Sequence, residues 1–308
     1  MRFAAFLSLS LLIGCAPATM QTATTPARAG DASARLGQLF QEDWEFRMRE
    51  SPLFATAVGD PRYNALLGSV SAADEERRAE QVRGSLARLE AIDRSALSRE
   101  EQISYDIYRR LRENELEAHR FRGYLMPITN REGFHTSFPQ LPDRQPLTTV
   151  QDYENYIARL RAFREYAGQH VELMRTGVRE GIALPRVVLT GVEETIQPHI
   201  VTDPTQSLLW KPFAEFPASV PEGERERLRA AGREAIAGSV VPAYQEFLQF
   251  MTSEYVPGAR QTIAARDLPN GQEYYEFLVR SYTTLDVTPE EVHQRGLSEV
   301  RRIRTEME

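Results

Sequence analysis

The segment 149–181, TVQDYENYIARLRAFREYAGQHVELMRTGVREG, decides the fold. Its apolar side chains recur at spacings of three and four residues, which places them on one face of an α-helix. These side chains are Tyr153, Tyr156, Ile157, Leu160, Phe163, Ala167, Val171, Met174 and Val178. The pattern predicts a long helix that begins near Thr149 and ends at Gly181.

The segments before this helix show the same periodicity. Residues 31–50 carry apolar side chains among charged ones, and a second, highly charged helix is predicted from Ser71 to about Ile92. Ser98 and Glu101 have the spacing of a capping box, in which each side chain accepts from the backbone N–H of the other residue. They predict a helix that extends to about residue 121.

The segments after the long helix are also typical of helices. A further helix is predicted after Pro221, with a kink or break at Pro242, because proline has no N–H to donate within the helix. Asn270 is a candidate cap for a helix over 273–282. The sequence has no sustained period-two alternation and no Asn-Gly hairpin between strand-like runs. We therefore predict an all-α fold, with any short strands confined to the loops.

Residues 122–147, RGYLMPITNREGFHTSFPQLPDRQPL, interrupt this series of helices. They contain four prolines, two glycines, three aromatic residues and one histidine. An irregular connection of this length is uncommon in a compact domain and usually serves a function. Two interpretations stay open: a loop that packs over the helices through its own aromatic side chains, or one wall of a cleft.

The segment 288–308, TPEEVHQRGLSEVRRIRTEME, predicts a helix with a well-formed start. Thr288 is a suitable N-cap, Pro289 fits the first helical position, and Glu291 completes a capping box. No stop signal follows the apolar residues at helical spacing, which are Val292, Leu297, Val300, Ile303 and Met307. Because such a face needs a packing partner, we expect the chain to be the N-terminal part of a longer protein.

Residues 1–14 resemble a secretion signal, with a positive charge at Arg2 and an apolar run that is shorter than the ~20 residues of a membrane span. The run leads into LIGC, which resembles the bacterial lipobox, and the cysteine of such a motif becomes the lipidated N-terminus. Cleavage after Ala18, within an A-x-A pattern, is the alternative. We favour lipidation at Cys15, because it is the only cysteine of the chain and stands at the lipobox position.

Residues 15–30 are mostly small and polar with no aromatic side chain, so they predict a flexible tether between the membrane and a folded body at 31–308. Ala16 follows the cysteine where an aspartate would indicate retention in the inner membrane. By resemblance to bacterial lipoproteins, the expected location is the cell envelope, at the outer membrane and facing the periplasm.

The charge excludes one class of partner. The chain has 37 Lys and Arg against 44 Asp and Glu, for a net charge of −7 that becomes −8 once residues 1–14 are removed. A mildly acidic, secreted protein is a poor binder of nucleic acid. The sequence also lacks G-x-G-x-x-G, a phosphate-binding GK[ST] loop and a G-x-S-x-G nucleophile elbow. With Cys15 lipidated, no thiol remains for a disulfide, a nucleophile or a metal ligand.

None of the five histidines lies in an H-E-x-x-H motif. Glu115 and His119 are four residues apart, and residues 290–293 form one Glu-x-x-His, but a solvated helix surface explains both patterns. The residues alone predict no catalytic side chain and no metal site. We single out His135, in the irregular segment, although a local hydrogen bond is the simpler explanation for it.

Several segments together resemble the bacterial family catalogued as domain of unknown function 885, many of whose members are secreted or lipid-anchored. The segments are SPLFATAVGDPRYN (51–64), YLMPITNREGFHTSFPQLP (124–142), GIALPRVVLTGV (181–192) and the most specific one, residues 268–308. The resemblance covers nearly all of residues 35–308. It implies a predominantly helical protein about twice this length that is similar to zinc metallopeptidases.

The zinc-binding part of the family pattern has no counterpart in this sequence. In the family, an H-E-x-x-H helix lies well downstream of the segment that matches 268–308, where two histidines bind zinc and the glutamate is the general base. No catalytic or metal-binding residue can therefore be carried over, and we expect this chain to be inert alone. Zinc and a peptide substrate are expected only for the full-length protein, together with the C-terminal half of its domain.

The resemblance implies that residues 31–308 form the front lobe of a zincin-like helical metallopeptidase fold and one wall of a substrate cleft. Within the irregular segment, Asn130, Arg131 and His135 are the candidates for that wall. A non-catalytic helical lipoprotein that binds a partner or scaffolds the envelope is the alternative. A third interpretation is a fragment produced by a frameshift or an assembly break, with no function of its own.

Overall fold

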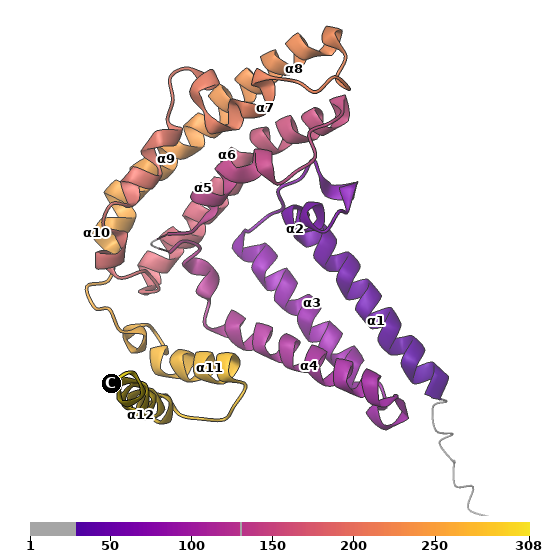
Figure 1. Cartoon of the computed structure of the whole chain (residues 1–308), viewed down its shortest axis with the longest axis vertical. Coiled ribbons are helices and arrows are strands. Elements are labelled where there is room, and N and C mark those ends of the chain that lie inside the picture. The colour runs from indigo at the N-terminus through magenta and orange to yellow at the C-terminus, as the bar shows by residue number, and fades with distance from the viewer. Residues whose placement is uncertain (1–28, 130) are drawn as a thin grey trace, which may run out of the picture.

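The structure is a computed structural model that describes residues 29–129 and 131–308, and the described residues are all-helical (Figure 1). The predicted signal, the lipidation site Cys15 and nearly all of the predicted tether lie outside the described residues. The α-helices are α1 (Ala29–Glu50), α2 (Pro52–Ala57), α3 (Ala72–Glu90), α4 (Arg99–Arg120), α5 (Phe134–Ser137), α6 (Val150–Glu180), α7 (Lys211–Ala214), α8 (Glu222–Ala235), α9 (Val241–Phe250), α10 (Val256–Gly258), α11 (Gly271–Thr283) and α12 (Pro289–Met307).

Helices α1, α3 and α4 pack side by side in one layer (Figure 1). The capping box that was predicted at the start of α4 is confirmed: Ser98 N donates to Glu101 Oε2 at 2.8 Å, and Glu101 N donates to Ser98 Oγ at 3.3 Å. The three helices bury a small apolar cluster between them. Its fully buried members are Ala32, Leu36, Leu39, Leu89, Ile92, Leu97 and Tyr105.

Helix α6 is the longest element of the described residues and carries the main core. Its predicted bounds are confirmed, since Asp152 N donates to Thr149 Oγ1 at 3.2 Å and Gly181 ends the helix in a left-handed conformation with φ 74°. Figure 1 shows α6 running alongside α8 and α9. The apolar face of α6 is buried against these helices, with Tyr156, Leu160 and Phe163 fully enclosed.

The predicted break at Pro242 is confirmed, and it takes the form of a widened turn. A π-helical turn at Ile236–Val240 joins α8 to α9, and a second one at Met251–Tyr255 joins α9 to α10. Each π-helical turn is followed by a proline near the start of the next helix, Pro242 or Pro257. A proline cannot donate to the carbonyl four residues earlier, and the wider turn leaves room for its ring.

Short helices make up half of the irregular segment 122–147. It contains α5 and 3₁₀ turns at Gly123–Leu125 and Phe138–Asp143, and the side chains of Phe134 and Phe138 are buried in the main core. No strand occurs among the described residues, where the single β-bridge joins Pro185 to Arg260.

One cap differs from its prediction. Asn270 stands at the N-cap position of α11, but its side chain makes no capping hydrogen bond. Its backbone is left-handed, with φ 56° and ψ 26°, a conformation that asparagine tolerates better than most residues. Asn270 therefore turns the chain into α11 and leaves the first N–H groups of the helix without a side-chain acceptor from this residue.

Helix α12 packs against α11 and leaves its apolar face in solvent (Figure 1). The capping box predicted for it is confirmed, because Thr288 N donates to Glu291 Oε2 at 2.7 Å and Glu291 N donates to Thr288 Oγ1 at 3.2 Å. The exposed fractions are 53% for Val300 and 45% for Ile303. No described helix combines the length and the apolar character that crossing a membrane requires.

We expect residues 31–308 expressed alone to self-associate through the exposed apolar face of α12. Replacing Val300→Glu and Ile303→Glu together places two charges on that face and reduces the self-association, measured by light scattering during size-exclusion chromatography. The matched control is Gln294→Glu with Thr305→Glu, which adds the same charge to the exposed side of the helix away from this face. A monomeric parent protein, or an equal effect of the control pair, would contradict this expectation.

Candidate functional site

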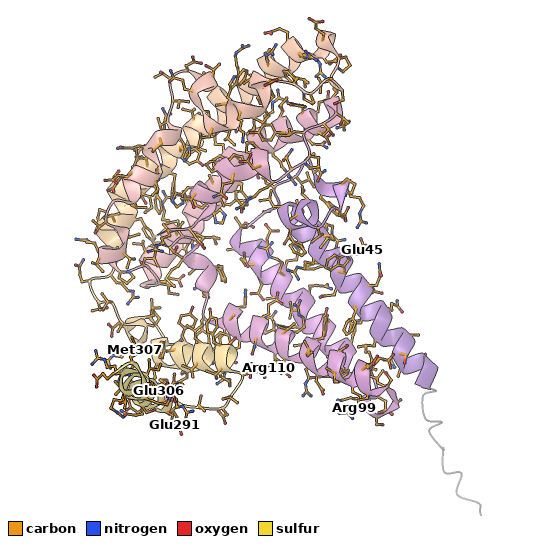
Figure 2. All side chains as sticks on the ribbon, in the orientation of Figure 1. Glu45, Arg99, Arg110, Glu291, Glu306 and Met307 are labelled. Atoms are coloured by element: carbon orange, nitrogen blue, oxygen red, sulfur yellow. The ribbon has the colours of Figure 1, made fainter. Side chains whose placement is uncertain are left out.

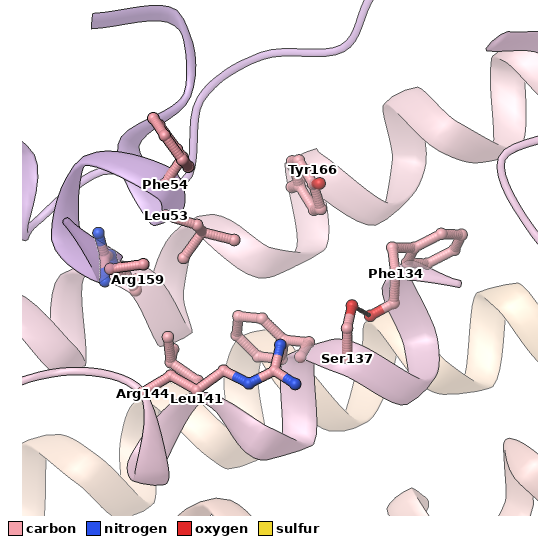
Figure 3. Close-up of a pocket in the computed structure, with 10 residues that line it drawn as sticks. Leu53, Phe54, Phe134, Ser137, Leu141, Arg144, Arg159 and Tyr166 are labelled. Atoms are coloured by element: carbon pink, nitrogen blue, oxygen red, sulfur yellow. Dashed lines mark hydrogen bonds between the residues drawn. The ribbon is translucent and has the colours of Figure 1, made fainter. Parts of the chain in front are cut away.

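A cavity of about 610 Å³ lies where α2, the α5 region and α6 meet (Figure 3). Figure 3 shows Leu53, Phe54 and Tyr166 on one side of the cavity and Phe134, Ser137, Leu141 and Arg144 on the other. The volume falls in the range of sites for small organic ligands. The lining residues are Leu53, Phe54, Ala57, Phe134, Ser137, Phe138, Leu141, Arg144, Arg159 and Tyr166. We call this cavity the α2–α5 pocket.

Both short walls of the pocket begin at residues that bend the chain. Pro52 occupies the first turn of α2, where its missing N–H costs nothing. Gly133 precedes α5, and a Cβ atom there would lie 2.7 Å from Ile128 Cγ2 and 2.8 Å from His135 Nδ1. The close approach at Gly133 lets the backbone fold tightly into α5, which turns Phe134 into the core and Ser137 toward the pocket.

The floor of the pocket depends on Arg159 of α6, whose side chain is fully buried. Its guanidinium donates only to neutral oxygen atoms, and it forms no ion pair with a described carboxylate. The acceptors are Leu66 O at 2.9 Å, Gln145 Oε1 at 2.9 Å, Thr56 Oγ1 at 2.7 Å, Pro52 O at 3.2 Å and Tyr63 O at 3.2 Å. Desolvation lowers the pKa of Arg159 to about 10, so it is still a cation at neutral pH. One buried arginine thus ties residues 52–66 to α6.

The rim of the pocket carries two polar side chains that the core does not use. Arg144 is exposed and donates to Gln140 Oε1, and it has no ion-pair partner among the described carboxylates. The hydroxyl of Tyr166 has no hydrogen bond within the described part of the chain, and burial raises its pKa. No aspartate or glutamate lines the pocket. The site therefore combines apolar walls with a positive charge.

Of the three cleft candidates predicted from the sequence, the two that the structure describes, Arg131 and His135, do not line this pocket. Asn130 falls outside the described residues, and the side chain of Arg131 is exposed. His135 is buried under the pocket wall, where its Nε2 lies 3.1 Å from Thr195 Oγ1, so its partner is 60 residues away in the sequence and not the local one that was expected. That any of them binds a substrate stays a prediction. The residues of the same segment that line the cavity are Phe134, Ser137, Phe138, Leu141 and Arg144.

Behind the pocket, His170 lies in an apolar environment. Its ring stacks on Phe134 with centroids 4.5 Å apart and meets the ring of Tyr166 edge-on at 4.7 Å. Neither ring nitrogen has a hydrogen-bond partner within the described residues. Burial lowers the pKa of His170 to about 4. Burial, reinforced by the charge of His199, lowers the pKa of His135 to about 4 as well. Both rings are therefore neutral in the folded protein at pH 7.

The free energy of unfolding is expected to fall as the pH drops from 7 to 5. An unfolded histidine has a pKa near 6.5, so between that pH and about 4 the unfolded chain binds more protons than the folded one and is favoured by acid. Each of the two histidines contributes about 2 kcal/mol to this loss. His170→Phe, which keeps the stacking, removes about half of the histidine contribution in urea denaturation at pH 7 and pH 5. His293→Gln, at an exposed position, is the control. If both variants lost the same amount of unfolding free energy between pH 7 and pH 5, the contribution of His170 to the pH dependence would be contradicted.

The described residues do not fit a zinc ion. Within residues 29–129 and 131–308, no group of three or more His, Cys, Asp or Glu side chains is arranged to hold a metal. Glu115 pairs with Arg112 at 3.0 Å, and His119 Nε2 lies 3.1 Å from Glu76 Oε2, so both of these helix-surface residues have protein partners. No reaction step is assigned to a metal at these residues.

A second, shallower groove of about 790 Å³ lies on the other side of the same segment. Its lining includes Pro139, Pro142, His199 and Trp210, and an ion pair between Lys211 and Asp143 at 2.7 Å crosses its edge. Its lining carries charges of both signs, because Glu194 lies there beside this ion pair, whereas the α2–α5 pocket has no acidic lining residue.

Sequence reasoning missed the residues that define the pocket. A signal for Arg159 was present, since it lies three residues after Tyr156 and four before Phe163, on the apolar face of the long helix. A charged residue on such a face needs buried partners. Arg144 and Tyr166 carried no comparable signal, because their importance depends on which distant side chains surround them.

Comparisons with known proteins extend the family resemblance. No curated protein matches this chain. Among solved structures, the fold matches the crystal structure of "the putative lipoprotein from Colwellia psychrerythraea", with a TM-score of 0.75 and 17% sequence identity. The match covers 88% of this chain and 49% of that chain, so this chain spans about half the length of the solved protein. At this identity the similarity shows a common fold.

The family can be assigned from the sequence match. The sequence model of a protein family, described as "Bacterial protein of unknown function (DUF885)", matches residues 52–308, which is most of the chain. The matched residues include both short walls of the α2–α5 pocket. This confirms the family that the four resembling segments indicated. The chain belongs to the bacterial family of proteins of unknown function DUF885.

Proposed function

We propose that this chain is the substrate-binding part of a lipid-anchored envelope protein that hydrolyses peptides with the aid of zinc. The observation that carries the proposal is the α2–α5 pocket. Two of the segments on which the family resemblance rests, 51–64 and 124–142, form its opposite walls. They are separated by two helices in the sequence, and residues of both line this cavity.

The peptidase part of the proposal is supported by the resemblance of the sequence to zinc metallopeptidases. The described residues would supply binding and orientation of the substrate, and the metal ligands would come from elsewhere in the full-length protein. The front-lobe position within a zincin-like fold is part of the same proposal. It accounts for a pocket with apolar walls at which the described residues form no metal site.

The anchoring part rests on the lipobox-like LIGC at 12–15 and on the description of the Colwellia psychrerythraea protein of similar fold as a lipoprotein. Lipid chains on Cys15 would hold the protein at the outer membrane, facing the periplasm. Cys15→Ser is expected to move the protein from the membrane fraction to the soluble fraction of the envelope. If the variant stays in the membrane fraction after a salt wash, the lipid anchor is refuted.

The hydrolase is tested on the complete gene product, with a library of quenched fluorescent peptides. We expect cleavage that 1,10-phenanthroline abolishes and added zinc restores. Ala57→Phe fills the pocket and is expected to lower kcat/KM at least about ten-fold, whereas Val58→Phe, at an adjacent exposed residue outside the lining, leaves it unchanged. A folded protein that cleaves no peptide in the presence of zinc overturns the proposal.

The second candidate is a non-catalytic helical lipoprotein that binds a partner or scaffolds the envelope. The observation in its favour is the exposed apolar face of α12, which includes Val300 and Ile303. This candidate expects no cleavage by the complete gene product, and it expects Val300→Glu with Ile303→Glu to weaken association with other envelope components. Zinc-dependent peptide cleavage would exclude it.

A further inference from the structure

The α2–α5 pocket has the walls of a site for an aromatic group. Phe54 and Tyr166 come from one side and Phe134 comes from the other (Figure 3), and Phe138 also lines the cavity. Aromatic rings pack on one another edge-to-face or offset, with a larger gain than their area alone provides. Leu53, Ala57 and Leu141 fill the spaces between these rings. A phenyl or indole group would therefore find apolar contact on both sides.

The charge of the pocket has a single sign. Arg144 at the rim and Arg159 at the floor are its only ionisable lining groups apart from Tyr166, and no carboxylate faces them from the lining. Arg159 has its donors committed to protein oxygen atoms, so it contributes a positive potential and no direct contact. Arg144 has its one described bond to the neutral Gln140, which leaves guanidinium N–H groups for a ligand. A planar carboxylate can accept two parallel hydrogen bonds from the N–H groups of one guanidinium.

The two hydroxyl groups of the lining differ in whether they already donate a hydrogen bond within the protein. Ser137 Oγ donates to Gly133 O at 3.0 Å, so its hydrogen is already used. The Tyr166 hydroxyl makes no hydrogen bond within the described residues and can donate to an anion. Figure 3 shows Tyr166 across the cavity from Arg144 and Ser137. An anionic group in the cavity would thus have a guanidinium on one side and a hydroxyl on the other.

We propose that the α2–α5 pocket binds a small aromatic carboxylate, with the ring between Phe54, Phe134 and Phe138 and the carboxylate at Arg144. This inference rests on the proposed function in one respect: it identifies part of the peptide substrate as an aromatic residue with a free C-terminal carboxylate. The binding itself requires no hydrolysis. A medium-chain fatty acid shares the combination of an anion and an apolar body, and it serves as the competing ligand.

The test is isothermal titration of the complete gene product with N-acetyl-phenylalanine, with N-acetyl-phenylalanine amide and with decanoate. We expect the aromatic acid to bind at least about ten-fold more tightly than its amide, because only the acid carries the charge that Arg144 recognises. We also expect it to bind more tightly than decanoate. Equal affinity for acid and amide refutes the anion site, and tighter binding of decanoate refutes the aromatic specificity.

Variants locate the binding in this pocket. Arg144→Gln is expected to remove the preference for the acid over the amide, whereas Arg179→Gln, at an exposed residue remote from the pocket, keeps it. Ala57→Phe fills the cavity and is expected to abolish binding of both compounds, while Val58→Phe leaves both affinities unchanged. Thermal melting of each variant confirms folding. An acid preference that survives Arg144→Gln in a folded protein overturns the proposal.

The two proposals fail independently. If the protein binds N-acetyl-phenylalanine more tightly than its amide but cleaves no peptide, the hydrolase proposal is refuted and the aromatic carboxylate site stands. If the protein cleaves peptides equally well with Arg144→Gln and does not bind N-acetyl-phenylalanine, the aromatic carboxylate site is refuted and the hydrolase proposal stands. If both hold, peptides that end in phenylalanine are cleaved with a lower KM than their C-terminal amides, and Arg144→Gln removes that difference.

Discussion

Replacing Arg159 with methionine is expected to lower the free energy of unfolding by about 4 kcal/mol. Methionine fills a similar volume on α6 but offers no donor to the oxygen atoms of Pro52, Tyr63, Leu66 and Gln145. A buried acceptor that loses its partner costs about 1–3 kcal/mol, and removal of the desolvated cation offsets part of the sum. Urea denaturation followed by circular dichroism measures the change.

The control for this variant is Arg161→Met, two residues further along the same helix. Arg161 is exposed and pairs with Glu234 at 2.6 Å, a surface ion pair that contributes at most about 1 kcal/mol. Arg159→Lys is expected to lie between the two, because an ammonium group cannot reach acceptors on all sides as the guanidinium does. A loss for Arg159→Met no larger than that of the control would refute the structural role of this side chain.

Replacing Phe163 with alanine is expected to lower the free energy of unfolding by about 3–4 kcal/mol. The ring of Phe163 is fully buried, stacks on Phe138 with centroids 3.7 Å apart, and lies 5.3 Å from the ring of Tyr244. Its removal leaves a cavity that the rigid contact between α6 and α9 cannot close. Because Phe138 lines the α2–α5 pocket, the variant also loosens one wall of the binding site.

Two other substitutions serve as comparisons for the loss of unfolding free energy caused by Phe163→Ala. Phe163→Leu retains most of the apolar volume, so its expected loss is about 1–1.5 kcal/mol. Ile107→Ala on α4 removes an exposed side chain and is expected to change the stability by less than about 0.5 kcal/mol. Equal losses for Phe163→Ala and Ile107→Ala would mean that the aromatic stack around Phe138 does not hold the core.

The long helices were predictable because their determinants are local. The bounds of α6 follow from the apolar spacing between Thr149 and Gly181, and capping boxes marked the starts of α4 and α12. Pro242 marked a break in the same way, although the sequence did not predict that the break is a π-helical turn. The exception was Asn270, whose left-handed backbone depends on the path of the chain into α11.

The candidate site was predictable only in outline. The prolines, glycines and aromatic residues of the irregular segment left a packed loop and a cleft wall equally open, and half of the residues that line the α2–α5 pocket come from this segment. The residues selected within it were Asn130, Arg131 and His135, whereas the lining residues that come from it are Phe134, Ser137, Phe138, Leu141 and Arg144. The turns of an irregular segment decide which of its side chains face a cavity. In this protein, contacts with α6 set those turns.

The sequence by itself determined the helical class, the positions of the main helices, the lipobox-like signal and the family. These depend on periodicity, on capping within four residues, and on short motifs. The tertiary structure alone decided that residues 52–66 attach to Arg159, that Phe134 and Phe54 face the same cavity, and that Arg144 stands at its rim without a carboxylate partner. These contacts join residues that are distant along the chain, and they form only when α2 and α5 pack on opposite sides of the cavity that α6 also lines.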